Sequence, residues 1–282
     1  MVDQLYSLYK VCLPDVVRNA DIVKAILSAH DNHIIYHTEN GKPVGVSVIN
    51  KNTIYLLCVR NEHRGKGIGS DLLKKSEAHI KKSGYDKIVI GAGKDYITPG
   101  IPMSDNAHVF FMKHGYIHSW EGEKCIDMDR DMNTFACTGI NVGDVINGTI
   151  YRWANCNDIK QVVSFISSSY ESFTEHYQNP ELYNQSNQNT VLIAELDKEI
   201  TGAIIVSVDI DDSLGSLGAL STAEKHRKKG IATNLLNLGT KFLKDIGVRR
   251  VHLSYTYCAL IPMYSRAGYK ICQEYYMGEK TL

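Results

Sequence analysis

The feature that most constrains the fold of this chain is an internal repeat. Residues 64–90 align with residues 227–253 at one constant offset of 163 residues. The matched positions share polar chemistry as well as hydrophobicity, because a basic, glycine-containing stretch opens both copies and a glycine, Gly84 or Gly247, lies near the end of both. Such self-similarity indicates a duplication within the gene. A chain of 282 residues also exceeds the usual size of one domain, so we expect two domains.

Each copy predicts an amphipathic helix. Apolar or small residues recur at helical spacing over residues 68–80 and over residues 231–246. Gly84 and Gly247 lie where a glycine in the left-handed conformation commonly ends a helix. We therefore expect one helix directly after each glycine-containing stretch.

Short apolar runs before and after these helices predict strands. The predicted strands are residues 44–49, 54–59 and 88–90 in the first copy and residues 201–208, 216–221 and 251–253 in the second. Turns at residues 51–52 and 211–213 make the first two strands of each copy a hairpin, and the third strand follows the helix. The expected fold class is α/β (α+β), with a mixed sheet in each half that contains a strand, glycine loop, helix, strand crossover.

A segment rich in Gly, Asn and Thr, residues 133–148, interrupts both periodicities. We place the boundary there, with an N-terminal domain of residues 1–140 and a C-terminal domain of residues 146–282. The first domain opens with predicted helices between residues 5 and 27. The second opens with a predicted strand at residues 149–153.

The charge balance limits the partners. Lys plus Arg equals Asp plus Glu, 31 each, so no global basic field favours nucleic acid or an anionic membrane. No apolar run reaches the roughly 18 residues of a membrane span, and the first residues carry an acid where a signal peptide carries positive charge. We expect a cytoplasmic protein, monomer or homodimer, that acts on a small molecule or a peptide.

The seven cysteines are odd in number and scattered. They include no Cys-x-x-Cys pair, and no His pair has zinc-site spacing. We interpret them as reduced thiols and expect no metal site.

The glycine-containing stretch between strand and helix has the form of an anion site. A strand that runs into a tight turn and then a helix directs unpaired backbone N–H groups and the positive end of the helix dipole to one place. Gly67 and Gly69 would let phosphate oxygens approach the backbone, while Arg64 and Lys66 would supply charged donors. A tight turn with solvated cations is the alternative. Because the pattern occurs in both halves, we favour a pyrophosphate site.

Two other phosphate-binding patterns fit less well. A P-loop requires Ser or Thr after Gly-Lys, and none of the three Gly-Lys pairs is followed by one. A dinucleotide fingerprint is closer, since Gly65 and Gly67 follow a strand and Asp86 lies about 20 residues on. The second copy breaks that pattern, with Lys228 in place of Gly65 and Arg249 in place of Asp86.

The paired loops resemble the acetyl-CoA pyrophosphate motif of the GNAT superfamily. The pattern Arg-x-x-Gly-x-Gly or Ala is matched by Arg64, Gly67 and Gly69, and again by Arg227, Gly230 and Ala232. Residues 106–116 and 264–269 resemble the last helix of the family and the strand after it. The resemblance covers nearly the whole chain. It implies two GNAT-like domains and an N-acetyltransferase that uses acetyl-CoA (coenzyme A).

The resemblance also implies which residues contact the cofactor. In the first copy these are Cys58, Val59, Arg64, Gly65, Lys66, Gly67, Ile68, Gly69, Ser70 and Asn106. In the second copy these are Ser221, Thr222, Arg227, Lys228, Lys229, Gly230, Ile231, Ala232 and Thr233. Backbone N–H groups near residues 58–59 and 221–222 would steady the thioester oxygen.

In the family, a tyrosine of the last helix commonly acts as the acid that meets the departing CoA thiolate. Tyr264 holds this position in the second copy, and Phe111 holds it in the first. A phenol of pKa about 10 would give its proton to a thiolate, whose thiol has a pKa of about 8.5, at a cost of about 2 kcal/mol, so the hydroxyl would act largely as a hydrogen-bond donor. Tyr264 is the expected catalytic residue, with a core aromatic as the alternative interpretation. Tyr96 is the next candidate acid.

The acceptor side is less defined. Residues 90–111 are ten longer than residues 253–264, and the insertion holds two prolines and a glycine where a GNAT substrate cleft would open. It would shape that cleft or form a plain surface loop. Phe173, Tyr177 and Tyr183 would line an acceptor pocket or belong to the core. The candidate general bases, by location alone, are Glu171, Glu175 and His176.

Three functions are compatible with these features. We expect an N-acetyltransferase that transfers an acetyl group from acetyl-CoA to an amine of a small molecule or peptide by direct attack. The alternatives are a non-catalytic acyl-CoA-binding regulator and a nicotinamide nucleotide-binding enzyme that uses Gly65 and Gly67. A bound ligand of the size of CoA would separate the first two from the third, and turnover with amines would separate the first from the second.

Overall fold

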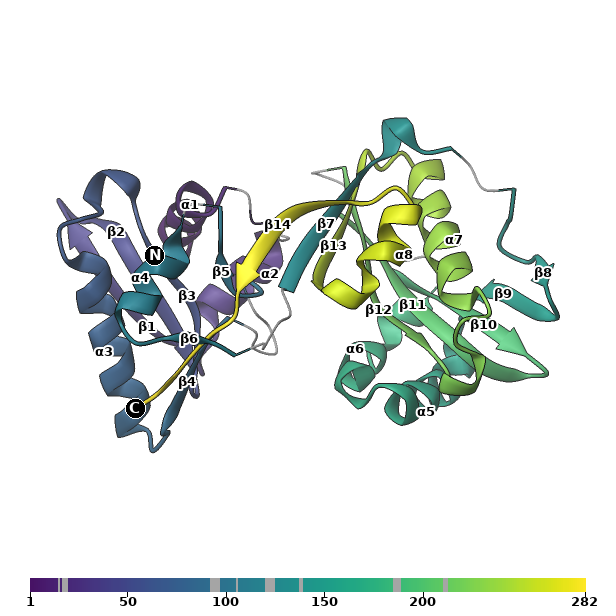
Figure 1. Ribbon diagram of the computed structural model, residues 1–282, viewed down its shortest axis with the longest axis horizontal. Helices are drawn as coiled ribbons and strands as arrows, with labels where there is room; N and C mark the ends of the chain where they lie inside the picture. The colour runs from purple at the N-terminus through teal and green to yellow at the C-terminus, as the bar shows by residue number, and fades with distance from the viewer. Residues whose placement is uncertain are drawn as a thin grey trace. The chain divides into compact units, whose positions relative to one another are not determined.

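The computed structural model describes residues 1–14, 16, 20–91, 97–104, 106–119, 125–136, 139–184, 189–209 and 213–282. The chain divides into two compact units (Figure 1). Unit 1 consists of Met1–Asp127, Tyr255–Cys258 and Cys272–Leu282, and unit 2 consists of Met128–Ser254 and Ala259–Ile271. The predicted ranges 1–140 and 146–282 differ from these units. Each predicted range is continuous, whereas each unit takes segments from both halves of the chain.

Unit 1 contains a six-stranded mixed sheet with helices on both faces. Its strands, in spatial order, are β1 (His33–Glu39), β2 (Lys42–Asn50), β3 (Thr53–Val59), β4 (Lys87–Ile90), β15 (Gly278–Thr281) and β6 (Ile117–His118). Its helices are α1 (Val2–Cys12), α2 (Ala20–Ser28), α3 (Ile68–Lys82) and α4 (Ala107–Lys113), with a 3₁₀ turn at Asn61–His63. The helices predicted between residues 5 and 27 are confirmed, and the sheet begins only after them.

Alternation along β2 directs its side chains to two helix layers. Val46 and Val48 share a hydrophobic core with α1 and α2. Ser47 lies on the opposite face and hydrogen-bonds Ser76 of α3 across 2.8 Å. Gly45 also faces α3, where an added Cβ would lie 3.0 Å from a leucine methyl group. These small residues of β2 therefore let α3 pack close to the sheet.

The last strand of the chain completes the sheet of unit 1. β15 pairs antiparallel with both β4 and β6. Figure 1 shows this yellow C-terminal segment beside them. Ion pairs join Lys87 of β4 to Glu279 at 2.7 Å and Glu77 of α3 to Lys280 at 2.9 Å. This pairing places the C-terminal residues in unit 1, and it is the physical reason why the units are not continuous in sequence.

The second sheet is also mixed. In spatial order its strands are β5 (Ile101–Pro102), β14 (Lys270–Tyr276), β7 (Cys125–Asp131), β13 (Arg250–Tyr257), β12 (Leu214–Thr222), β11 (Glu199–Asp209), β10 (Thr190–Leu196), β9 (Thr149–Trp153) and β8 (Val145–Ile146). β5 and one end each of β7, β13 and β14 consist of unit 1 residues, and the rest belongs to unit 2. The helices of unit 2 are α5 (Ile159–Ser169), α6 (Thr174–Tyr177), α7 (Ile231–Asp245) and α8 (Ile261–Arg266). The 3₁₀ turns after β6 are Met132–Thr134, Cys156–Asp158, Glu171–Phe173, Pro180–Tyr183, Glu224–His226 and Cys258–Leu260.

The sequence repeat is present in the strand register and at the helix ends. The parallel strands β3 and β4 pair Thr53 with Val89, and β12 and β13 pair Ser216 with His252, which are the same positions after the offset of 163. Both α3 and α7 have 15 residues, and each follows a glycine with a positive φ, 82° and 83°. Glycines with φ of 89° follow both helices, as predicted. The predicted α/β fold class, with one strand, glycine loop, helix, strand crossover in each half, is confirmed.

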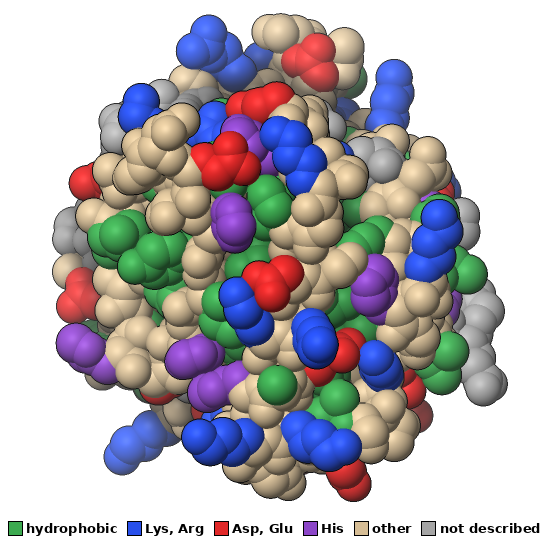
Figure 2. Space-filling model, turned by 90° about the vertical axis from the view of Figure 1, so that its left-hand side faces the viewer, with side chains coloured by type: hydrophobic (Ala, Val, Ile, Leu, Met, Phe, Trp, Pro, Cys, Tyr) green, Lys and Arg blue, Asp and Glu red, His purple; other side chains and the backbone are tan. Residues whose placement is uncertain are grey.

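The surface carries both signs of charge. Figure 2 shows Lys and Arg side chains intermingled with Asp, Glu and several His side chains on one face. Among the described helices, none is long and apolar enough to cross a membrane. Residues 211–212 of the predicted turn lie outside the described residues.

Candidate functional site

The parallel strands β3 and β4 part near the start of β3, after Ile54. Their ladder reaches Ile54 and Ile90, and the N–H of Gly91 donates to the Ile54 carbonyl at 2.9 Å. β3 then continues to Val59, held on its other side by β2. The edge of residues 55–59 that faces away from β2 therefore borders a wedge. A backbone edge of this kind can pair with an extended ligand.

A cavity of about 570 Å³ lies in this wedge. Its walls come from β3, the glycine loop, the start of α3, the end of α1, part of residues 97–102 and α4. Most of the wall is apolar, with Leu56, Ile101 and Phe111 among its residues. A mostly apolar cavity of this size, with a few polar groups, suits an organic ligand.

The glycine loop leaves its backbone open toward the cavity. Gly65 and Gly67 line the cavity and have φ of 75° and 82°, the left-handed region that glycine adopts without strain. A Cβ added at either position would meet no atom within 4 Å. At the start of α3, the N–H of Asp71 donates to the Gly67 carbonyl at 3.0 Å. The N–H groups of residues 68–70 precede this bond, so they can bind an anion.

Arg64 connects the loop to the end of β3. Its Nε donates to the Val59 carbonyl at 3.0 Å, and Arg227 makes the matched contact with the Thr222 carbonyl at 3.4 Å. Arg64 also lines the cavity. The residue predicted as a phosphate donor therefore also fixes the turn that presents the backbone N–H groups.

The structure brings most of the predicted cofactor residues of the first copy to one cavity wall. These are Cys58, Val59, Arg64, Gly65, Gly67, Gly69, Ser70 and Asn106. The side chain of Ile68 packs into the core instead, so this residue offers the cavity its backbone only. Lys66 is exposed and is not part of the cavity lining.

Helix α4 contributes polar groups to the same region. Asn106 precedes the helix with φ of 57°, and its side chain makes no capping hydrogen bond. At the other end, His114 hydrogen-bonds the hydroxyl of Ser70 through Nε2 at 3.1 Å and the Phe110 carbonyl through Nδ1 at 2.8 Å. This contact links α4 to the start of α3. Sequence reasoning missed His114 because its partner lies 44 positions away.

The loop inserted in the first copy forms part of the cavity. Its lining residues are Thr98, Gly100, Ile101 and Pro102. Within this loop, β5 pairs with the end of β14. A Cβ added at Gly100 would lie 2.8 Å from the sulfur of Met277, so a glycine allows this close approach. The described part of the insertion thus shapes the cavity, and Tyr96 lies outside the described residues.

The second glycine loop repeats the geometry in unit 2. Gly230 has φ of 83°, and Lys228 has φ of 62° where the first copy has Gly65. The N–H of Asn234 donates to the Gly230 carbonyl at 2.9 Å. Residues 231–233 therefore present backbone N–H groups ahead of this bond, as residues 68–70 do in unit 1.

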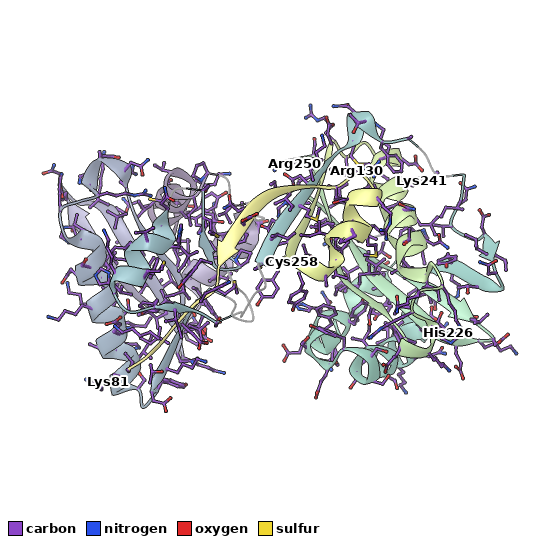
Figure 3. The ribbon with its side chains drawn as sticks, in the orientation of Figure 1. Lys81, Arg130, His226, Lys241, Arg250 and Cys258 are labelled. Carbon is purple, nitrogen blue, oxygen red and sulfur yellow. The ribbon has the colours of Figure 1, made fainter. Side chains whose placement is uncertain are left out.

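Positive charge surrounds this second loop. Burial lowers the pKa of His226, which directly precedes the loop (Figure 3), and the charges of Lys229 and Lys225 lower it further. Of the predicted residues, Arg227, Lys228, Lys229 and Gly230 are exposed, Thr222, Ala232 and Thr233 are half-buried, and Ser221 and Ile231 are buried. None of them lines the 570 Å³ cavity, whose lining consists of unit 1 residues.

The aromatic residues beyond α5 belong to the core of unit 2. Tyr177 and Tyr183 are 0% and 3% exposed and share one hydrophobic cluster, against which Phe173 packs. The Tyr177 hydroxyl donates to the Ala219 carbonyl, and the Tyr183 hydroxyl donates to the Tyr177 carbonyl, both at 2.8 Å. Burial raises the pKa of both phenols. The core interpretation of these aromatics is therefore correct.

The two candidate acid positions lie in different units. Phe111 lines the cavity of unit 1, with its ring 5.6 Å from that of Tyr116. Tyr264 in α8 of unit 2 is 7% exposed, with its ring 6.2 Å from that of Tyr269. The hydroxyl expected to meet a leaving thiolate thus occurs in unit 2, and a phenyl ring replaces it beside the cavity of unit 1.

The cavity wall includes residues that the glycine motif does not mark. Cys12, the last residue of α1, and Tyr55 of β3 both line the cavity. Cys12 lies outside the repeated segment and the predicted strands beside it, and Tyr55 lies in the predicted strand 54–59 but is not among the predicted site residues.

Family comparisons agree with the two-copy layout. The family described as Acetyltransferase (GNAT) domain matches residues 6–127, and the Acetyltransferase (GNAT) family matches residues 159–269. No curated protein matches the sequence. Two such domains indicate an acyltransferase that depends on acetyl-CoA.

Solved structures share the fold along the whole chain. A GCN5-related N-acetyltransferase from Sphaerobacter thermophilus has a TM-score of 0.75 at 18% identity, over 99% of this chain and 91% of that one. A tandem GNAT protein from the clavulanic acid biosynthesis pathway has 0.72 at 14%, over 99% and 94%. The glucosamine N-acetyltransferase region of a fungal multi-domain β-N-acetylglucosaminidase has 0.79 at 18%, and this chain, matched over 99%, spans 37% of that protein. The chain therefore belongs to the GNAT acetyltransferases and carries two of their domains in tandem.

Proposed function

We propose that this GNAT protein is an N-acetyltransferase that moves an acetyl group from acetyl-CoA to an amine of a small molecule or peptide by direct attack. The cavity of unit 1 is the observation that supports this function most. There the open edge of β3 meets the glycine loop and the start of α3. A thioester on a long amide-bearing arm, with a pyrophosphate at its far end, needs both a strand edge and a cluster of N–H donors.

In this proposal different residues of unit 1 bind different parts of the cofactor. The N–H groups of residues 68–70 and the guanidinium of Arg64 bind the pyrophosphate. The edge of residues 55–59 pairs with the amide-bearing arm, and the amide of Asn106 gives a further polar contact. Backbone N–H groups near residues 58–59 steady the thioester oxygen as negative charge develops on it.

The transfer forms a nitrogen–carbon bond and breaks the carbon–sulfur bond of the thioester. The amine loses one proton to solvent or to a base, and the departing thiolate takes one up. In unit 2 the Tyr264 hydroxyl would donate a hydrogen bond to that sulfur, while Phe111 cannot do so in unit 1. Catalysis in unit 1 would therefore depend on a different donor or on water.

A second candidate function is a non-catalytic acyl-CoA-binding regulator. Phe111 favours it, because this residue lines the cavity at the position where the resemblance predicts an acid. Under this interpretation unit 1 binds the cofactor without turnover.

The acceptor is proposed to be a small molecule or peptide, with neither nucleic acid nor membrane as a partner. The intermingled charges in Figure 2 and the equal numbers of acidic and basic residues support this expectation. One protein of the same fold is named for glucosamine N-acetylation, so amino sugars belong among the acceptors to be tested.

Two measurements test the proposal. Acetyl-CoA at 100 times its dissociation constant is expected to raise the free energy of unfolding by about 2.7 kcal/mol, visible as a higher melting temperature, while NAD should have no effect. Release of free thiol is then followed with glucosamine, polyamines, amino acids and peptides as acceptors. Stabilisation by NAD and not by acetyl-CoA would contradict the proposed binding of acetyl-CoA. Acetyl-CoA binding without thiol release for any amine would favour the regulator.

A further inference from the structure

Two cysteines from distant parts of the chain meet in the wall of the cavity. Cys12 ends α1, Cys58 lies near the end of β3, and both side chains line the cavity. Neither is in a disulfide, each is 6% exposed, and both belong to the same hydrophobic cluster. Both residues lie in the part of the core where α1 packs against the sheet, and each thiol shifts the pKa of the other, which places them as neighbours. The cavity gives small molecules access to a pair that the protein surface otherwise covers.

The surroundings make the two thiols unequal. The hydrogen bond from Cys58 lowers the pKa of Cys12, and the positive charges of Arg64 and Arg60 lower it further. The same hydrogen bond and burial raise the pKa of Cys58 well above its usual value. Because the thiolate is the reactive form of cysteine, these directions make Cys12 the candidate nucleophile and Cys58 the candidate resolving thiol.

We propose that Cys12 and Cys58 form an oxidation-sensitive dithiol in the cofactor cavity, which hydrogen peroxide converts into a disulfide that joins α1 to β3. In the first step the Cys12 sulfur attacks the peroxide, a sulfur–oxygen bond forms, the oxygen–oxygen bond breaks and water leaves. In the second step the Cys58 sulfur attacks Cys12, the sulfur–sulfur bond forms, and the sulfenic oxygen leaves as a second water with the Cys58 proton. Two thiols and one peroxide thus give one disulfide and two waters.

The disulfide changes the wall to which the cofactor is proposed to bind. A sulfur–sulfur bond is about 2.05 Å long, so the two free sulfur atoms must move toward each other when it forms. Cys58 lies in the open edge of β3, and Arg64, whose charge acts on Cys12, lines the same cavity. We therefore expect the oxidised protein to bind acetyl-CoA more weakly and bound acetyl-CoA to slow the oxidation. This consequence rests on the proposed function, whereas formation of the disulfide does not.

Other cysteines provide internal controls. The described cysteines outside the pair are Cys125, Cys156, Cys258 and Cys272. Cys156 is exposed and lies outside the cavity lining, so it reports unselective oxidation at the surface.

The test uses the full-length protein, reduced and then freed of reductant. It is treated with one equivalent of hydrogen peroxide, and its peptides are analysed by mass spectrometry without reduction. The expected product is a linked pair of peptides, holding Cys12 and Cys58, that is two hydrogen atoms lighter than the separate peptides and that dithiothreitol separates. Oxidation of Cys156 while Cys12 and Cys58 both stay reduced would overturn the proposal.

Variants identify the order of attack. In Cys58→Ser the resolving thiol is missing, so dimedone should trap a sulfenic acid on Cys12. Cys156→Ser is the matched control and should give the same yield of the linked peptides as the unchanged protein. Trapping at Cys156 but not at Cys12 would contradict the assignment. Since the linked peptide is sought in the unchanged protein, the proposal stays testable even if Cys58→Ser fails to fold.

Repeating the oxidation with acetyl-CoA present separates the dithiol proposal from the proposed function. With acetyl-CoA at 100 times its dissociation constant, about 1% of the sites stay empty, so crosslinking should slow by up to about 100-fold. An unchanged rate with cofactor shown by calorimetry to be bound would overturn the mutual exclusion. Failure of acetyl-CoA to bind the reduced protein would instead overturn the proposed function. The linked peptides would still show whether Cys12 and Cys58 form a disulfide.

Discussion

At the scale of single residues, one hydroxyl separates the two copies at the candidate acid. Phe111 and Tyr264 occupy matched positions in α4 and α8, and both are largely buried. The residue with the hydroxyl packs in unit 2, whereas the residue without it lines the cavity of unit 1. Cofactor binding and proton donation can therefore be tested separately by exchanging these two side chains.

Replacing Tyr264 by Phe is expected to lower kcat by 10² to 10⁴ with acetyl-CoA affinity unchanged, because the change removes one donor and keeps the ring in place. Steady-state kinetics and calorimetry measure the two quantities. If the hydroxyl is only a core group, its loss lowers stability by about 1 kcal/mol and leaves kcat intact. Phe111→Tyr is the matched control, which should leave kcat unchanged. A higher kcat in this control would place turnover in unit 1.

Gly67 permits a direct test of the anion site. Gly67→Ala places a Cβ where no atom lies within 4 Å, in the space proposed for the pyrophosphate, so acetyl-CoA affinity should fall at least tenfold. Gly84→Ala is the matched control, because its φ of 89° resembles the 82° of Gly67 and its surroundings are equally open. Left-handed strain costs about 1–2 kcal/mol of stability at either position. Equal affinities of the two variants by calorimetry would refute the site in unit 1.

At the scale of elements, a charged cluster holds β9, β10 and the start of α5 together. Arg152 of β9 donates to both carboxylate oxygens of Asp158 at 2.8 Å and to Glu195 of β10 at 2.6 Å. Asp158 also accepts the N–H of Asn155 at 2.8 Å and completes a capping box before α5. The hydrogen bonds from Arg152 lower the pKa of Asp158. The cluster therefore couples the stability of unit 2 to pH.

Because the pKa of Asp158 is lower in the folded state, its contribution is complete above the unfolded value of about 3.9 and is lost as pH falls through the folded value. Asp158→Asn should reduce the free energy of unfolding by about 2 kcal/mol at pH 7 and weaken the pH dependence below about pH 4. Urea unfolding at a series of pH values measures both effects. Asp245→Asn is the control, since its ion pair with Lys241 is exposed and contributes about 0.5 kcal/mol. Similar losses in both variants would show that the cluster has no special role.

Local patterns predicted the helices and strands around both glycine loops. α3 and α7 begin at Ile68 and Ile231, where the apolar periodicity begins. The sequence could predict these helices because the periodicity depends only on residues that are close together in the chain. Strand β15 was not predicted, since Gly-Glu-Lys-Thr has no apolar run and Thr281 pairs with Lys87 from the other half of the chain. Cys12 joined the candidate site for the same reason, through a contact that only the folded chain reveals.

At the scale of the whole molecule, neither half of the sequence contains a complete unit. Unit 1 needs Tyr255–Cys258 and Cys272–Leu282 in addition to the N-terminal residues. Unit 2 begins at Met128 and so includes residues 128–140 of the predicted N-terminal range. The two copies are therefore not independent domains, because each unit includes residues from both halves of the sequence.

Residues 1–140 expressed alone should fail to form a stable unit 1, because the edges of β4 and β6 lose their partner strand. Co-expression with residues 146–282 should restore a complex that elutes as one species and binds acetyl-CoA. Size-exclusion chromatography and thermal unfolding measure these outcomes, with the intact chain as reference. A cooperative melting transition for residues 1–140 alone, at the temperature of unit 1 in the intact chain, would show that β15 is dispensable.

The position of β15 in the chain also determines when unit 1 can complete its sheet during synthesis. Domains generally fold as units while the chain leaves the ribosome, the N-terminal one first, at about 5–20 residues per second. Here β4 gains its antiparallel partner strand only after β15 has been made, roughly 10 to 40 s after β4. During that interval the edge of β4 is open to other chains, so a nascent-chain chaperone should engage the first copy for longer than the second.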